Sequence, residues 1–133
     1  MLKRNKRFFL ILLTLALPFG CVGCASDGGS ATYEQISGAE AKALMDSESG
    51  YIIIDARTQS EYDEGHIPGA ILIPEYEIAD RAEKELPDKK QLILVYCRSG
   101  RRSKIAAEEL VKLGYTNVKE FGGIIDWEYD TTK

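Results

Sequence analysis

The sequence is poor in the residues that build metal sites and disulfide frameworks. It has one histidine and three cysteines in 133 residues, and Cys21 and Cys24 lie close together near the start. One histidine and one further cysteine cannot supply the ligands of a zinc site of known spacing. Because two of the three cysteines lie together near the start, the sequence also argues against a disulfide framework. We therefore expect no metal and no cofactor, with Cys97 left as the one free thiol of the remaining chain.

An excess of positive charge is also lacking. The chain has 17 Lys and Arg against 21 Asp and Glu, a formal net charge of −4. Without the four basic residues at the very start, 13 basic residues stand against 21 acidic ones, a formal charge of −8; those four are Lys3, Arg4, Lys6 and Arg7. Such a surface is a poor match for nucleic acid or anionic lipid. We expect no nucleic-acid partner.

The N-terminal segment has the anatomy of an export signal. Its basic residues precede an apolar run over residues 8–17, which is too short to span a bilayer comfortably. Two cysteines follow, each after a glycine, and the second, Cys24, directly precedes a polar stretch, which resembles a bacterial lipoprotein processing site. Cys21 is the alternative site of lipid modification. An ordinary signal cleaved near Ala25, or an uncleaved anchor, are the alternatives to a lipoprotein.

These features divide the chain into three parts. Residues 1–24 are the signal peptide and lipoprotein processing region, residues 25–32 are a small, polar and flexible linker, and residues 33–133 suit one domain with one core. We expect a monomer held by a lipid anchor. Its expected location is the outer side of the bacterial cytoplasmic membrane, or a site facing the periplasm.

Helical and extended patterns alternate along the domain. Ser37 and Glu40 form a capping-box pattern at the start of a helix. Apolar runs predict strands, and two amphipathic segments predict further helices, the second ended by Gly114. The strands are expected over 51–55, 70–73, 92–96 and 118–121, and the helices over 76–86 and 102–113. This alternation indicates an α/β domain whose sheet is covered on both faces.

The stretch from Leu92 to Ser103, LILVYCRSGRRS, carries the chemistry. A strand delivers Cys97 to a tight loop before a helix, where unpaired N–H groups and the positive end of the helix dipole meet the thiol. Gly100 lets successive N–H groups point inward, and the arginines add positive charge. These features favour the thiolate, which is the reactive form. The expected anion-binding residues are Arg98, Ser99, Gly100, Arg101, Arg102 and Ser103.

A cysteine that ends a buried strand is often only a small hydrophobic residue. Three arginines around a Gly-Ser loop are hard to explain as packing, although one or two of them can form salt bridges on a solvated face. We therefore favour the interpretation that Cys97 is a nucleophile in an anion-binding loop.

The loop CRSGRRS resembles the active-site loop of rhodanese-type sulfurtransferases. The resemblance covers most of residues 33–129, including YIIIDARTQSEYDEGHIPGAILIP and LGYTNVKEFGGIIDWE, in which Gly122 and Gly123 are expected to permit close packing beside the loop. Four residues separate Cys97 from Arg102, the spacing associated with sulfur transfer, whereas cysteine phosphatases have five. The resemblance implies a rhodanese domain with a five-stranded, mainly parallel sheet and helices on both faces.

The same resemblance implies sulfur transfer through a persulfide on Cys97. The thiolate takes a sulfane sulfur from a small anionic donor such as thiosulfate, and cyanide, a small thiol or a protein thiol then accepts it. Two alternatives stay open. One is a non-catalytic module that senses persulfides or binds a protein. The other, which the short loop disfavours, is a cysteine phosphatase or arsenate reductase.

Three residues before the loop are candidates for supporting roles. Asp55 can orient the cysteine loop, but we favour a structural role in which Asp55 caps the next turn while Arg57 pairs with Glu61. His66 is the single histidine, and a general base for Cys97 is one interpretation of it. The Pro-Gly turn that follows favours a turn residue bonded to the backbone.

The lipoprotein interpretation predicts the effect of replacing Cys24 with Ser. This variant is expected to leave the membrane fraction or to stay unprocessed. Lipid insertion contributes about 0.8 kcal/mol per buried methylene, whereas an unmodified chain of charge −8 lacks that contribution. Cell fractionation measures how much of the variant stays in the membrane fraction. If Cys24→Ser is processed and membrane-held like the parent, Cys21 is the lipid site, and if the double variant also behaves like the parent, the interpretation is wrong.

Overall fold

The structure is a computed structural model, and it describes residues 32–133. The export signal, both lipidation candidates and nearly all of the linker therefore lie outside the described residues. Within residues 32–133 we find no helix with the length and apolar character that crossing a membrane requires.

The described part of the chain is built on a five-stranded sheet in the order β1-β5-β4-β2-β3, and every pair of neighbouring strands is parallel. β4 lies in the middle with all of its residues buried, as expected for a strand covered on both faces. The predicted parallel sheet is confirmed. Its strands are β1 (Glu34–Gln35), β2 (Ile52–Asp55), β3 (Ile71–Leu72), β4 (Ile93–Cys97) and β5 (Val118–Gly123).

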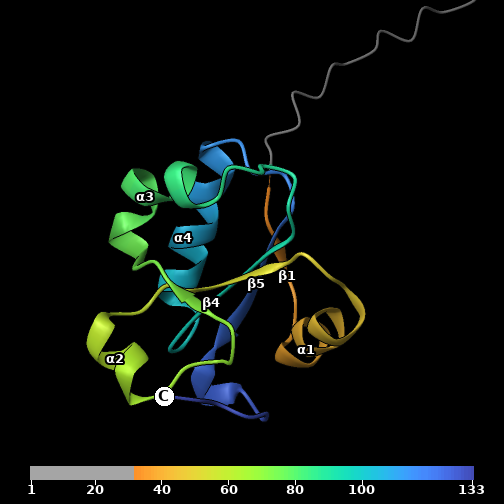
Figure 1. Cartoon of the computed structure of the whole chain (residues 1–133), viewed down its shortest axis with the longest axis vertical. Coiled ribbons are helices and arrows are strands. Elements are labelled where there is room, and N and C mark those ends of the chain that lie inside the picture. Colours follow the sequence, from red (N-terminus) through yellow and green to blue (C-terminus); the bar gives the residue numbers. More distant parts are fainter. Residues whose placement is uncertain (1–31) are drawn as a thin grey trace, which may run out of the picture.

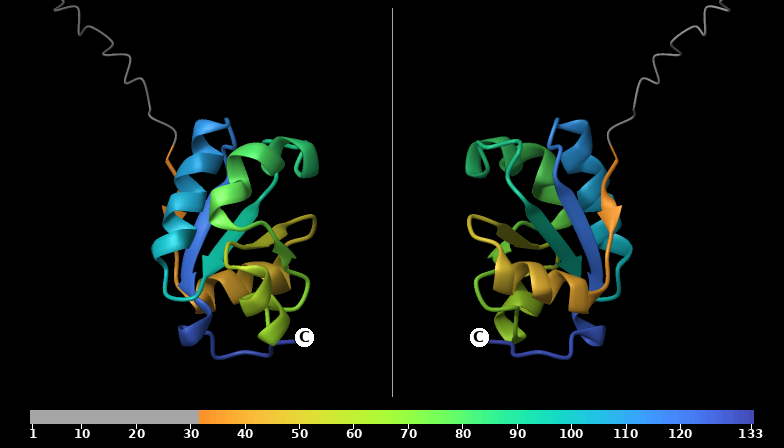
Figure 2. Two further views of the ribbon diagram at one scale, coloured as in Figure 1. Left: turned by 90° about the vertical axis from the view of Figure 1, so that its left-hand side faces the viewer. Right: turned by 90° about the vertical axis from the view of Figure 1, so that its right-hand side faces the viewer.

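Helices cover both faces of this sheet. α3 (Ile78–Glu85) and α4 (Arg101–Lys112) lie side by side on one face, and α1 (Gly38–Ser47) lies on the other (Figures 1 and 2). α2 (Gln59–Glu64) follows β2, and two single turns, η1 (Glu75–Glu77) and η2 (Ile124–Asp126), follow β3 and β5.

Alternate side chains of β4 enter two different cores. Val95 and Cys97 pack with α3 and α4, whereas Leu94 and Tyr96 pack with α1. This alternation is the two-residue period of a strand. It directs the Cys97 side chain toward α4, whose first turn begins just beyond it.

Most predicted elements are confirmed within one or two residues at their ends. The capping box is present, since the Ser37 hydroxyl accepts from the Glu40 N–H at 3.2 Å and the Glu40 carboxylate accepts from the Ser37 N–H at 2.7 Å. The predicted helix over 76–86 is a 3-10 turn followed by α3. Cys97 was expected in a turn, but it is the last residue of β4.

Two elements were missed from the sequence. β1 is a two-residue, exposed and polar edge strand, so it shows no apolar alternation. α2 has six residues and buries none of them. A usable signal was present for α2, because Thr58 and Glu61 repeat the capping-box pattern and bond each other in both directions, at 3.0 and 3.3 Å.

The end of β5 packs directly under the loop that follows β4. Cys97 pairs with Gly123 after a shift in the register between the two strands. A Cβ atom added to Gly123 would lie only 2.0 Å from the Arg98 carbonyl oxygen. The backbone of Gly123 has an ordinary extended conformation, with φ −123°. Glycine is therefore required here for close approach and not for its torsion angles.

Gly123→Ala is accordingly expected to destabilise the fold, because the new methyl group overlaps the loop. Overpacking of this kind lowers the free energy of unfolding by about 1–3 kcal/mol. Chemical denaturation measures the change. Gly38→Ala is the matched control, since its Cβ would lie 3.5 Å from the Trp127 ring, an ordinary contact. If both variants unfold alike, close approach is not the reason for glycine at position 123.

Candidate active site around Cys97

Cys97 lies where β4, the loop and α4 meet. Its side chain is buried, with 1% of the residue exposed. The loop turns at Gly100, whose φ of 104° is in the left-handed region that favours glycine. Gly100 is the N-cap residue of α4 and has no side chain with which to accept a hydrogen bond. Its own N–H donates to the Cys97 sulfur at 3.0 Å, so the sulfur occupies the N-terminal end of the helix.

Two opposing effects set the pKa of the Cys97 thiol. Burial raises the pKa, because it removes water from the thiolate. Hydrogen bonds to the sulfur lower it and outweigh burial; they come from the Ser103 hydroxyl and from the N–H groups of Ser103, Gly100 and Ser99. The pKa of Cys97 is therefore below its ordinary value, and the loop favours the reactive thiolate.

One of the three loop arginines is held by an ion pair. Arg102 donates to both oxygens of Glu61 on α2, at 2.7 and 2.8 Å. Hydrogen bonding by this guanidinium holds the pKa of Glu61 at about 2. The expected pairing of Arg57 with Glu61 was wrong, because the fold brings α2 against the start of α4. The pair anchors the end of the cysteine loop to α2.

The other two arginines of the loop point to solvent. Arg98 and Arg101 are both exposed, and neither has an ion-pair partner within residues 32–133. They place two positive charges beside the buried sulfur, on a domain whose overall charge is negative. An anion that approaches Cys97 therefore meets a local positive potential.

Asp55 and Arg57 belong to a buried network on the other face of the sheet. Arg57 pairs with Asp55 at 2.7 Å, and the Tyr96 hydroxyl donates to the same carboxylate at 2.6 Å. The Arg57 N–H also donates to Asp55 at 2.9 Å, which closes the turn after β2. Arg57 further donates to the Gly65 carbonyl at 2.7 Å. These contacts connect β2, β4 and the segment after α2, and they do not include Cys97.

His66 is bonded to backbone. Its Nδ1 lies 3.0 Å from the Tyr62 carbonyl oxygen, and its ring stacks on the Tyr62 ring with the centroids 3.7 Å apart. Its backbone bridges to Thr132, with both hydrogen bonds at 2.8 Å. The contacts of His66 thus connect α2 to the C-terminal segment.

Glu120 is a site residue that the sequence interpretation did not single out. It lies on β5 with 3% of its surface exposed, and it accepts a hydrogen bond from the Ser103 hydroxyl at 2.6 Å. The available signal was a charged residue two positions after Val118, and therefore on the same face of the predicted strand as that apolar residue. Glu120 faces the same side of the sheet as Cys97, because Val118, two positions earlier, packs in the core that contains Cys97.

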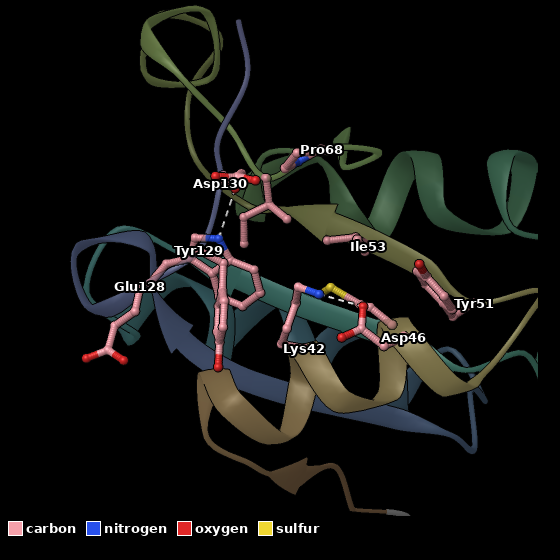
Figure 3. A pocket seen from close by; sticks show the side chains of 11 residues that line it. Lys42, Asp46, Tyr51, Ile53, Pro68, Glu128, Tyr129 and Asp130 are labelled. Atoms are coloured by element: carbon pink, nitrogen blue, oxygen red, sulfur yellow. Dashed lines mark hydrogen bonds and ion pairs between the residues drawn. The ribbon is translucent and has the colours of Figure 1, made fainter.

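A separate pocket of about 430 Å³ opens on the α1 side of the sheet (Figure 3). It lies between α1 and the C-terminal segment, with Lys42 and Asp46 on one wall and Tyr129 and Asp130 on another. Its floor includes Ile53, which belongs to the core opposite the one that contains Cys97.

Residues 32–133 hold no group of three or more His, Cys, Asp or Glu placed to bind a metal ion. The lowered pKa of the buried Cys97 thiol and the exposed arginines beside it make Cys97 and its loop the candidate active site.

Comparison with known proteins points to one family. Residues 37–130 match the rhodanese-like domain. The thiosulfate sulfurtransferase PspE of Escherichia coli strain K12 is 42% identical over 73 residues, which cover 55% of this chain and 70% of that protein. The thiosulfate sulfurtransferase GlpE of Coxiella burnetii is 35% identical over 97 residues, which cover 72% of this chain and 88% of that protein.

Solved structures agree. A rhodanese with anions from E. coli is 38% identical, with a TM-score of 0.59 over 62% of this chain and 98% of that chain. The solution structure of a rhodanese-like domain from Anabaena is 29% identical, with a TM-score of 0.70 over 76% of this chain and 80% of that chain. The fold, the cysteine loop and these similarities together show that this chain belongs to the family of rhodanese-like domains.

Proposed function

We propose that this protein transfers a sulfane sulfur through a persulfide on Cys97. The family, and its relatives named thiosulfate sulfurtransferase, support a rhodanese-type sulfurtransferase in general terms. The observation that carries the finer proposal is the buried Cys97 sulfur, which accepts from the Gly100 N–H at 3.0 Å and has a lowered pKa. A nucleophile stabilised as an anion needs no separate base at the moment of attack.

The first half-reaction loads the enzyme. The Cys97 thiolate attacks the outer sulfur of a donor such as thiosulfate and forms a new S–S bond. The bond between the two sulfurs of the donor breaks, and sulfite leaves with the electron pair. Arg98 and Arg101 support this step, because exposed cationic side chains attract the dianionic donor and the departing sulfite.

The loop then stabilises the loaded form. The terminal sulfur of a cysteine persulfide carries the negative charge that was on the thiolate. N–H groups of Ser99, Gly100 and Ser103 point toward the sulfur site, at the positive end of the α4 dipole. Preorganised donors of this kind stabilise an anion without first having to be ordered.

The second half-reaction returns the enzyme to its starting state. A thiophilic acceptor attacks the terminal sulfur, the S–S bond to Cys97 breaks, and Cys97 leaves as the thiolate. Cyanide becomes thiocyanate, and a thiol becomes a persulfide. A small thiol or a protein thiol is the acceptor class that we propose. The burial of Cys97 requires the acceptor atom to reach into the loop.

We also propose that the catalytic domain is exported and held at the membrane by a lipid on Cys24. The support is the basic and apolar N-terminal pattern, which lies outside the described residues. The acidic charge of the domain gives it little affinity of its own for anionic lipid.

Cys97→Ser is expected to abolish thiosulfate:cyanide sulfur transfer and to leave the fold intact, because the hydroxyl keeps the size of the side chain but is a poor nucleophile. Intact mass after thiosulfate treatment should show one added sulfur atom on the parent, removable by cyanide, and none on the variant. Thermal unfolding checks the fold. Appreciable turnover by the folded variant rules out the covalent mechanism. A parent that gains sulfur and does not pass it on indicates persulfide sensing instead of catalysis.

Phosphatase activity is expected to be negligible. Four residues stand between Cys97 and Arg102, and Arg102 is tied to Glu61, so the ring is narrow for a tetrahedral phosphate ester. Hydrolysis of an aryl phosphate by the parent, measured beside sulfur transfer under the same conditions, tests this. A hydrolysis rate that rivals sulfur transfer and is lost in Cys97→Ser favours the phosphatase alternative.

A further inference from the structure

Two large apolar side chains stand out on the surface of residues 32–133. Tyr76 and Ile125 have 66% and 61% of their surface exposed, more than the other large apolar residues in this range. Single exposed apolar residues are ordinary, but these two both follow the carboxyl end of a strand, in η1 after β3 and in η2 after β5. Ligands of open parallel sheets bind at this edge. Cys97 ends β4 at the same edge.

Backbone hydrogen bonds place η1 and η2 on either side of the cysteine loop. The Ile125 N–H donates to the Arg98 carbonyl at 3.3 Å, so η2 lies directly against the loop. On the other side, the Glu75 N–H donates to the Ala56 carbonyl at 3.1 Å, and the Ala56 N–H donates to the Tyr96 carbonyl at 2.9 Å. These bonds continue the sheet order β5-β4-β2-β3 past the strand ends. The cysteine loop therefore lies between η1 and η2.

The distance between η1 and η2 is too large for a small substrate to contact both. Three strand spacings of about 4.8 Å separate β5 from β3, so the two segments lie roughly 14 Å apart. Cyanide or a small thiol that reaches Cys97 cannot contact Tyr76 and Ile125 together. A standard protein interface covers about 800 Å² on each partner, which is enough to include both. The two apolar residues thus suit a protein bound at the opening of the site.

The cationic side chains beside the loop are free to meet a partner. Arg98 and Arg101 are exposed, and so is Lys104, one turn further along α4. None of the three has an ion-pair partner within residues 32–133. Tyrosine and arginine are also the residues that most often carry the binding energy of protein interfaces.

The acidic residues of η1 and η2 do not cancel this positive charge. Glu77 is paired with Arg81 at 2.6 Å. Glu75 is half-buried and Asp126 is exposed, so two carboxylates stand against three cationic side chains. The surface around the opening therefore has a positive sign, and a partner with acidic side chains complements it.

We propose that the sulfur acceptor is a protein that docks at the opening of the cysteine loop and inserts a cysteine there. The docking surface consists of Tyr76, Ile125, Arg98 and Arg101. The partner presents apolar side chains to the first two residues and acidic side chains to the arginines. Its cysteine stands on a projecting segment, because only 1% of Cys97 is exposed. The inference rests on the proposed function, since it names the acceptor of the second half-reaction.

The transfer to such a partner balances without a further reactant. The acceptor thiolate attacks the terminal sulfur of the Cys97 persulfide and forms a new S–S bond. The bond between that sulfur and Cys97 breaks, and its electron pair stays on Cys97 as a thiolate. The acceptor leaves as a persulfide anion, so two negative charges are present before and after the step. No oxidant or reductant is consumed.

The test measures the second half-reaction alone. The protein is loaded with thiosulfate, freed of excess donor and mixed with one of three thiols. The first is the end-blocked peptide Asp-Glu-Leu-Cys-Leu-Glu-Asp, the second has lysine in place of every acidic residue, and the third is N-acetylcysteine amide. Transfer to cyanide gives the reference rate. At low ionic strength, the acidic peptide is expected to take sulfur about tenfold faster per thiolate than the other two thiols.

Two substitutions separate docking from chemistry. Tyr76→Ala and Ile125→Ala each remove an exposed apolar side chain, and each is expected to lower transfer to the acidic peptide about tenfold relative to transfer to cyanide. Tyr129→Ala is the matched control, because Tyr129 is also exposed but lines the pocket on the α1 side. This control should leave the ratio unchanged. Thermal unfolding checks that all three variants fold.

The inference is overturned if the three thiols react alike, or if Tyr76→Ala and Ile125→Ala change the ratio no more than Tyr129→Ala does. Either result assigns the acceptor role to small thiols. A parent dimer that Tyr76→Ala dissociates, measured by light scattering, assigns the surface to a second copy of this chain and also overturns the inference.

Intact mass keeps this result distinct from the proposed function. A parent that gains a cyanide-removable sulfur but fails the tests with the peptides disproves the docking alone. A parent that gains no sulfur from thiosulfate disproves sulfur transfer, and the docking with it.

Discussion

The site depends on one interaction, in which the Cys97 sulfur accepts a hydrogen bond at the N-terminus of α4. Every helix begins with N–H groups that have no partner within it. Here the Gly100 N–H donates to the sulfur at 3.0 Å, so the Cys97 side chain connects the strand end to the helix start. The same contact holds the loop and favours negative charge on sulfur. Structure and reactivity therefore share one hydrogen bond.

Burial and hydrogen bonding shift the pKa of the Cys97 thiol in opposite directions, and the fold sets the size of both effects. The Cys97 thiol is almost fully buried, which disfavours a charge on the sulfur, while several hydrogen-bond donors stabilise that charge by more than burial disfavours it. The close approach of Gly123 to the Arg98 carbonyl holds the loop down against β5. A loop further from the sheet would admit water and spread the donors apart, so tight packing here has a chemical consequence.

Buried and half-buried polar groups around the sheet fall into separate networks with separate roles. Asp55 and its partners join the elements on the α1 face, and the Glu61–Arg102 pair ties the loop end to α2. The hydrogen bond from the Ser103 hydroxyl to Glu120 joins the first turn of α4 to β5. Breaking one partner of such a buried pair costs more than the pair contributes, because the other is left uncompensated.

Local sequence determined the strands, the main helices, the Ser37 capping box and the loop that carries Cys97, because periodicity, caps and glycines act over a few neighbouring residues. Local sequence did not determine which side chains pair with one another in the fold. Arg57 and Glu61 are close in sequence, yet the fold pairs Arg57 with Asp55 and Glu61 with Arg102, 41 residues away. The short polar strand β1, and the contact of Glu120 with Ser103, also became visible only in the sheet. The contacts of Glu61 with Arg102 and of Glu120 with Ser103 depend on how distant segments are brought together in the fold, and no local pattern encodes them.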